Sequence, residues 1–172
     1  MASRAPERIT WAVAQLKVKP TDRILEIGCG RGVAAALICE QLRTGRFIGL
    51  DRSAVAIAAA VARNREHVRS GKADFLKVAL ADAELRMRFD KVIAINVNVF
   101  WINPMRELAV IRQLLVPGGG LYLFYEPPSS SQLERAAAAC VTYLRKGGFK
   151  IKRVLRDRST RPLLGLVATT QA

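Results

Sequence analysis

The sequence has little that could bind a metal or cross a membrane. Its 172 residues include one histidine, His67, and three cysteines, Cys29, Cys39 and Cys140, with no paired metal-ligand spacing. We therefore predict no metal site. An odd number of cysteines, with no apolar signal-peptide core after Met1, favours free thiols in a reducing compartment, so we expect a cytoplasmic protein. No apolar run reaches the roughly 18 residues of a membrane span, so we expect no membrane partner.

Acidic residues are outnumbered by basic ones, 14 to 28, which gives a net charge of +14. Half of this excess lies in a basic stripe, which we define as Arg145, Lys146, Lys150, Lys152, Arg153, Arg156, Arg158 and Arg161. Within these bounds only Asp157 is acidic. Such a stripe is what binding to a phosphate backbone requires, so RNA is a candidate partner. Alternatively, arginine is simply abundant in a GC-rich genome, and the charge serves solubility alone.

The pattern of apolar residues alternates between short strands and helical periodicity, which predicts a parallel α/β sheet. The length favours a single domain over 1–172, with a lead-in helix within 1–20. The predicted strands span 23–27, 46–50, 74–78, 91–95, 121–125, 149–156 and 163–169. The predicted helices span 6–16, 33–42, 54–68, 103–116 and 131–146, with Ser53 and Ser131 as N-caps of the third and fifth. A short polar turn joins the last two strands.

A glycine-rich turn follows the first predicted strand. The residues from Glu26 to Gly32 read E-I-G-C-G-R-G. Glycines let the backbone approach a ligand closely, and the following helix directs free N–H groups at it. The dinucleotide fingerprint G-x-G-x-x-G does not fit, because Val33 stands where its third glycine would be. The pattern E-x-G-x-G-x-G instead resembles the first motif of class I S-adenosylmethionine-dependent methyltransferases.

Four further segments resemble motifs of the same family, in the order in which the family has them. Together with the glycine turn they cover roughly 23–126. They are 47–53, a strand ending in Asp51; Ala81-Asp82-Ala83; 89–96, the fourth strand; and 114–121, the turn before the fifth strand. The resemblance implies a methyltransferase with S-adenosyl-L-methionine as cofactor. It also implies a doubly wound, Rossmann-like, seven-stranded, mostly parallel sheet with an antiparallel C-terminal hairpin.

The resemblance assigns cofactor roles to residues at the carboxyl ends of the strands. The glycine turn, with Glu26, Gly28, Cys29, Gly30 and Gly32, would hold the methionine part through backbone groups. Asp51 would accept hydrogen bonds from both ribose hydroxyls. Asp82, with the backbone of Ala83, would contact the adenine, although Asp82 could equally be a helix N-cap. Arg52 stands where the family often has an apolar residue on the adenine, and Asn96 stands beside the methionine amine.

The segment after the fourth strand indicates where the methyl acceptor would bind. Asn98, Phe100 and Trp101 would face it, forming an aromatic wall that suits a flat or apolar ligand, unless the two aromatic residues belong to the core. The segment lacks the N-P-P-[FY] signature of many enzymes that methylate amino groups of bases or glutamine. Glu126, after the fifth strand, is a candidate general base or a residue that fixes a loop.

Three functions therefore remain open from the sequence. We favour methyl transfer to a small-molecule acceptor. The first alternative is an RNA methyltransferase that uses the basic stripe from Arg145 to Arg161. The second is a protein that binds the cofactor without catalysis and acts through protein contacts. The sequence leaves the oligomeric state open.

Overall fold

The computed structural model describes residues 5–157 and 162–170, which form a seven-stranded sheet in the order β3-β2-β1-β4-β5-β7-β6. The strands are β1 Arg23–Ile27, β2 Arg46–Asp51, β3 Ala73–Lys77, β4 Phe89–Ile95, β5 Leu115–Tyr125, β6 Phe149–Asp157 and β7 Leu163–Thr170. Neighbours from β3 to β5 pair in parallel, whereas β7 lies antiparallel between β5 and β6. The predicted fold class is confirmed.

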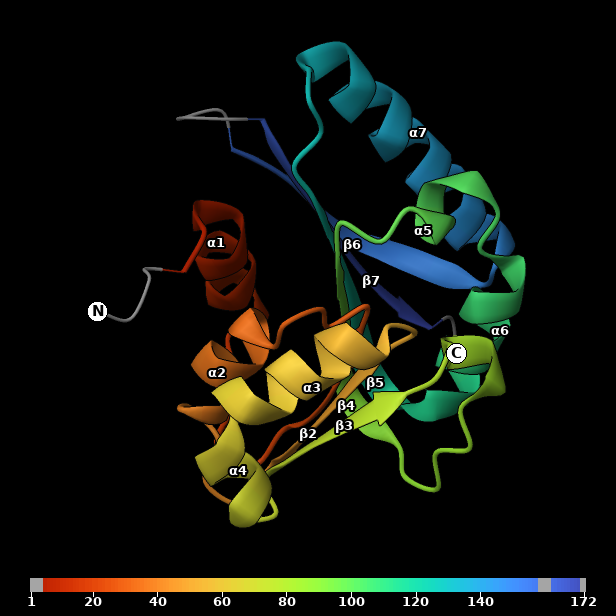
Figure 1. The fold of residues 1–172 in the computed structure, drawn as a ribbon. Helices are drawn as coiled ribbons and strands as arrows, with labels where there is room; N and C mark the ends of the chain where they lie inside the picture. The colour runs from red at the N-terminus through yellow and green to blue at the C-terminus, as the bar shows by residue number, and fades with distance from the viewer. Residues whose placement is uncertain (1–4, 158–161, 171–172) are drawn as a thin grey trace.

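Helices cover both faces of the sheet (Figure 1). They are α1 Glu7–Leu16, α2 Val33–Cys39, α3 Ala54–Arg63, α4 Arg65–Arg69, α5 Val99–Ile102, α6 Met105–Leu114 and α7 Ser130–Lys146, with a short 3₁₀ helix, η1, at Leu80–Asp82. Because successive strand side chains point to opposite faces, Ile24 and Ile93 pack with α1 and α2, whereas Leu25 and Val92 pack with α6 and α7. The sheet is therefore apolar on both faces, as a doubly wound fold requires.

Several element boundaries differ from the prediction for local reasons. The helix predicted over 54–68 is interrupted at Asn64, whose buried amide donates hydrogen bonds to the carbonyls of Gly32 and Ala60. The N-cap of α7 is Ser129, not Ser131, because the Ser129 hydroxyl accepts a hydrogen bond from the backbone N–H of Gln132. The predicted N-cap Ser53 is confirmed by its hydrogen bond from Ala56.

The C-terminal hairpin is present, and its two strands correspond closely to the predicted ranges. The predicted polar turn, with Arg158 and Arg161 of the basic stripe, lies outside the described residues. Since β6 runs parallel to β5, Lys150 and Lys152 lie at the amino-end edge of the sheet, whereas Arg156 lies at the carboxyl-end edge. In the described part of the chain, no helix is both long and apolar enough to span a membrane.

Candidate functional site

The glycine turn after β1 adopts a backbone conformation that side chains disfavour. Gly28, Gly30 and Gly32 all have positive φ angles, of 70°, 51° and 69°. At Gly28 a Cβ would lie 2.8 Å from Cγ2 of Val97, so the turn passes too close to the segment after β4 for a larger residue. At Gly30 a Cβ would meet nothing within 4 Å. The backbone at Gly30 is therefore open to a ligand.

Gly32 is needed for the packing of two helices. A Cβ there would lie 2.5 Å from Nδ2 of Asn64 and 3.0 Å from Ala60 on α3. The Cys29 side chain is also largely buried, at 6% exposure, and its backbone N–H donates to the carbonyl of Leu50 at 2.9 Å. Gly32 thus packs against α3, and Cys29 joins the turn to β2. Gly28 and Gly30 remain as the positions at which a ligand could approach the backbone.

Asp51 ends β2 and is held by the backbone on two sides. One carboxylate oxygen accepts a hydrogen bond from the N–H of Gly30 at 2.9 Å, and the other accepts one from Ser53 at 2.9 Å. A carboxylate oxygen has more than one lone pair, so both oxygens can still accept hydrogen bonds from a ligand. The carboxylate is thereby oriented at the end of the strand before any ligand binds.

Glu26, on β1, is only 3% exposed, and its Oε2 has no hydrogen-bond partner among the described residues. Burial, reinforced by the negative charge of Asp51, raises the pKa of Glu26 to about 8. An unsatisfied buried carboxyl group is costly in a native structure. A cationic or hydrogen-bond-donating ligand group near the turn would relieve this cost, which fits the methionine part of S-adenosylmethionine.

A cavity of about 490 Å³ lies beside the turn, at the carboxyl ends of β1, β2 and β4. Its lining includes the predicted cofactor residues Gly28, Asp51, Arg52 and Asn96. Asp82 and Ala83 are not part of this lining, which is formed on that side by Val78, Ala79 and Leu80. The Asp82 side chain is instead 64% exposed and pairs with Arg106 at 3.1 Å. The structure thus brings together the predicted residues of the first, second and fourth strand ends, and it leaves Asp82 outside.

A second cavity, of about 680 Å³, adjoins the first, because Asn96 and Asn98 line both. Asn96 has a left-handed backbone, with φ of 56°, and its Oδ1 accepts a hydrogen bond from the N–H of Glu126 at 2.8 Å. The side chain of Asn96 therefore connects the ends of β4 and β5 at the junction of the two cavities.

The wall of the second cavity differs in part from the prediction. Trp101, 39% exposed on α5, lines it together with Asn98. The Phe100 side chain does not line the cavity, because it is buried in the core with 1% exposure. The backbone carbonyl of Phe100 accepts a hydrogen bond from the thiol of Cys140 at 3.5 Å. Consecutive residues of a helix point about 100° apart, and here Phe100 faces the core while Trp101 faces the cavity.

Residues from the other side of the second cavity were not predicted. They are Tyr125, Pro127, Pro128, Gln132, Arg135, Ala136 and Ala139, which belong to the end of β5, the following loop and α7. The Tyr125 hydroxyl donates to the carbonyl of Val97 at 3.2 Å. The prediction took the acceptor-facing residues from the segment after β4 and only Glu126 from the end of β5, although the motif order placed both strand ends at the same edge.

Glu126 lines the second cavity and also forms an ion pair with Arg8 of α1, at 3.3 Å. The Glu126 side chain is 14% exposed and that of Arg8 is 38% exposed. The lead-in helix thus reaches the edge of the candidate acceptor cavity. Among the described residues no group of three metal-binding side chains is present.

Comparison with known proteins decides the family. A family model described as a methyltransferase domain matches residues 25–121, more than half of the chain. The chain belongs to this methyltransferase family. The predicted family, with S-adenosylmethionine as its cofactor, is thereby confirmed, and the match includes the glycine turn and the strand ends that line the first cavity.

The curated relatives are longer than this methyltransferase domain. It is 29% identical over 120 residues to a protein-L-isoaspartate O-methyltransferase of Roseiflexus castenholzii, a match that covers 67% of the chain and 52% of the relative. It is 32% identical over 115 residues to a trans-aconitate 2-methyltransferase of Streptomyces avermitilis, which covers 63% of the chain and 41% of the relative. The chain thus spans about half the length of these relatives.

Solved structures show the same fold. The magnesium protoporphyrin IX methyltransferase of Synechocystis, crystallised with bound S-adenosylmethionine, superposes with a TM-score of 0.69 at 20% identity. The superposition covers 95% of this chain and 76% of that one. Likeness at this level of identity establishes the fold, and the acceptor must be argued from the residues of this chain.

Proposed function

We propose that this protein transfers a methyl group from S-adenosylmethionine to a small-molecule acceptor. The observation that carries the proposal is the junction of two cavities at Asn96 and Asn98. Gly28 of the glycine turn and Asp51 line the first cavity, and Trp101 and polar side chains line the second. A reaction between two bound molecules needs this arrangement, because the enzyme gains rate mainly by holding both reactants in line.

The residues of the first cavity fit the cofactor. The exposed backbone at Gly28 and Gly30 would hold its methionine part, the carboxylate of Asp51 would accept hydrogen bonds from its ribose, and Glu26 would lie behind the turn. When bound, S-adenosylmethionine supplies an electrophilic methyl group on a sulfonium, so the protein needs to align and shield the reactants more than to activate them. Asn96, fixed by its hydrogen bond to Glu126, would position the two molecules at the junction.

The second cavity indicates the kind of acceptor. Trp101 and Pro127 provide apolar surface, whereas Gln132 and Arg135 provide hydrogen-bond donors from α7. A guanidinium binds carboxylate or phosphate groups through paired hydrogen bonds. We therefore infer an acceptor with a flat or apolar part and a polar or anionic group. Glu126 could accept a proton from the acceptor, although its ion pair with Arg8 equally supports a role in fixing the loop.

The position of the basic stripe favours a small acceptor over RNA. Lys150, Lys152 and Arg153 belong to the part of β6 that lies away from the carboxyl ends of the strands. Arg156 lies nearer the candidate site, but its guanidinium pairs with Glu134 at 2.9 Å. These three residues would hold RNA at the amino-end edge of the sheet, whereas the cavity beside Trp101 lies at the carboxyl-end edge.

The test is transfer of a labelled methyl group. The protein is incubated with methyl-labelled S-adenosylmethionine and a fractionated cell extract, with Asp51→Ala as the control. Label in the small-molecule fraction, absent with the control, supports the proposal. Label in RNase-sensitive material would replace it by the RNA alternative. Cofactor binding without any transferred label would favour the non-catalytic alternative.

A further inference from the structure

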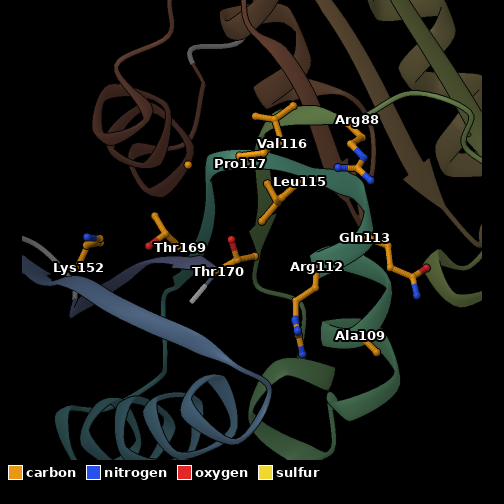
Figure 2. Close-up of a pocket in the computed structure, with 11 residues that line it drawn as sticks. Arg88, Ala109, Arg112, Gln113, Leu115, Val116, Pro117, Lys152, Thr169 and Thr170 are labelled. Atoms are coloured by element: carbon orange, nitrogen blue, oxygen red, sulfur yellow. The ribbon is translucent and has the colours of Figure 1, made fainter. Parts of the chain in front are cut away.

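A third cavity, of about 830 Å³, lies at the opposite edge of the sheet (Figure 2). It is formed by the start of β5, residues of α6 from Ala109 onward, Lys152 of β6 and the end of β7, together with Arg88 before β4. None of its lining residues lines either cavity of the candidate methyl-transfer site. It is therefore a separate hollow at the amino ends of the parallel strands.

Three basic side chains from three different elements line this cavity, namely Arg88, Arg112 and Lys152. Figure 2 shows the two arginines on one side, Lys152 on the other, and Thr169 and Thr170 between them in this view. No acidic residue is among the lining residues that the structure describes, and none of the three basic groups forms an ion pair there. The cavity thus carries positive charge without a compensating acid.

A neighbouring hollow of the same protein differs in having acidic residues in its lining. It has a volume of about 390 Å³ and shares Thr169 and the segment 116–118 with the third cavity. Its lining includes two acids, and both are paired, Asp22 with Lys91 and Asp90 with Arg23 at 3.2 Å. The described lining of the third cavity has no acid that could pair with its cations, which makes the cavity suited to an anionic ligand.

The local backbone positions two of the three cations. Lys152 is the extra residue of a β-bulge, because Ile151 pairs with Ala168 and Arg153 pairs with the next residue, Val167. A bulge redirects a side chain from its regular place on the strand and is common beside binding sites. The Arg112 guanidinium lies against the turn at Gly148, where a Cβ would be 3.1 Å from its Nη1.

We propose that this cavity binds the phosphate groups of a ligand. Guanidinium and ammonium groups with nearby hydroxyl and amide donors are the usual partners of phosphate oxygens, and Thr169, Thr170 and Gln113 supply the uncharged donors. The lining within the described residues includes no aromatic side chain, so it offers no surface on which a base could stack. Recognition is therefore of phosphate itself, carried by a small phosphorylated molecule or by an RNA backbone.

The experiment compares two variants of equal net charge. In the first, Arg88→Gln, Arg112→Gln and Lys152→Gln remove the three cations of the cavity. In the control, Arg43→Gln, Arg65→Gln and Arg69→Gln remove three exposed cations beside β2 and β3, at the side of the sheet away from β6 and β7. Tripolyphosphate and a short single-stranded RNA are titrated into both variants and the wild-type protein, and thermal melts check that all three are folded.

We expect the cavity variant to lose about tenfold or more in affinity for tripolyphosphate, for RNA or for both, while the control changes by less than about twofold. If RNA is the ligand, the slope of log affinity against log salt should also fall by about 2, since each phosphate contact on a single strand contributes about 0.7. A lower affinity for tripolyphosphate alone identifies a small phosphorylated ligand, and a lower affinity for RNA identifies a nucleic-acid backbone.

Equal weakening in both variants would overturn the proposal, because it would show an effect of net charge alone. Absence of binding by the wild-type protein would also overturn it. S-adenosylmethionine affinity is measured in the same samples and should be the same in all three proteins. This site and the proposed methyl transfer can thus fail independently.

Discussion

The carboxylate of Asp51 accepts a hydrogen bond from the backbone N–H of Gly30 at 2.9 Å. This contact joins the end of β2 to the glycine turn after β1, so the two parts of the candidate cofactor site hold each other in position. Binding then needs little rearrangement, and preorganisation of this kind saves part of the entropic cost of binding.

Gly30→Ala should weaken S-adenosylmethionine binding by about tenfold or more, because the added methyl group would project from the proposed cofactor turn into space with no described heavy atom within 4 Å. Gly71→Ala is a matched control, since Gly71 also has a positive φ and nothing within 4 Å of an added Cβ, but lies outside the turn. Both variants should lose about 1 kcal/mol of stability through backbone strain. Equal cofactor affinity in the two variants, measured by calorimetry, would contradict the assignment of the turn.

Glu26→Gln should change how stability depends on pH. Because the folded protein raises the pKa of Glu26 from 4.5 to about 8, the folded state holds a proton that the unfolded state releases between these values. The stability of the wild-type protein should therefore fall relative to the variant as pH rises through that window, by about 1.4 kcal/mol per pH unit. Urea unfolding across this range measures the difference. Parallel profiles for the two proteins would show that Glu26 titrates normally.

Trp101→Ala should impair use of the acceptor more than binding of the cofactor, because the ring lines the second cavity only. Ile102→Ala, an exposed residue of the same helix outside the cavity, controls for damage to α5. In steady-state assays KM for the acceptor should rise by tenfold or so in the first variant and stay near the wild-type value in the second. A larger loss of cofactor affinity than of acceptor use would show that Trp101 contacts the cofactor, and would contradict its place in the acceptor cavity.

Asp82→Ala should have little effect on cofactor affinity, less than about threefold, since Asp82 lies outside the lining of the first cavity and pairs with Arg106 on the surface. Its stability should change by no more than about 0.5 kcal/mol, as for exposed ion pairs. Direct titration with S-adenosylmethionine measures the first effect. A loss as large as that of Asp51→Ala would restore Asp82 as the adenine contact that the family resemblance implied.

The strands, and the edge of the sheet at which the candidate site lies, could be predicted from the sequence. Short apolar runs separated by glycine and proline turns are a local signal, and five motifs in family order fixed the strand ends. β5 is longer than predicted because the Pro117 turn is included within the strand, where Leu115 pairs with Phe89.

What could not be predicted depends on contacts between distant segments. Nothing local to Asn64 indicates that its amide will meet Gly32, and nothing local to Phe100 distinguishes a core ring from a cavity ring. The same holds for the ion pair of Arg8 with Glu126, which joins residues 118 positions apart. Only the three-dimensional arrangement separates the two adjoining cavities or places Lys152 on a bulge.

The central claim is that the carboxyl edge of the sheet binds S-adenosylmethionine through Asp51. Calorimetric titration of the cofactor into the wild-type protein and Asp51→Ala tests it most directly, with Asp74→Ala, an acid of β3 paired with Arg46, as the control. We predict one site per chain, a loss of about tenfold to a hundredfold in Asp51→Ala for two hydrogen bonds, and no loss in the control. Unchanged affinity in Asp51→Ala, or no binding by the wild-type protein, would contradict the account.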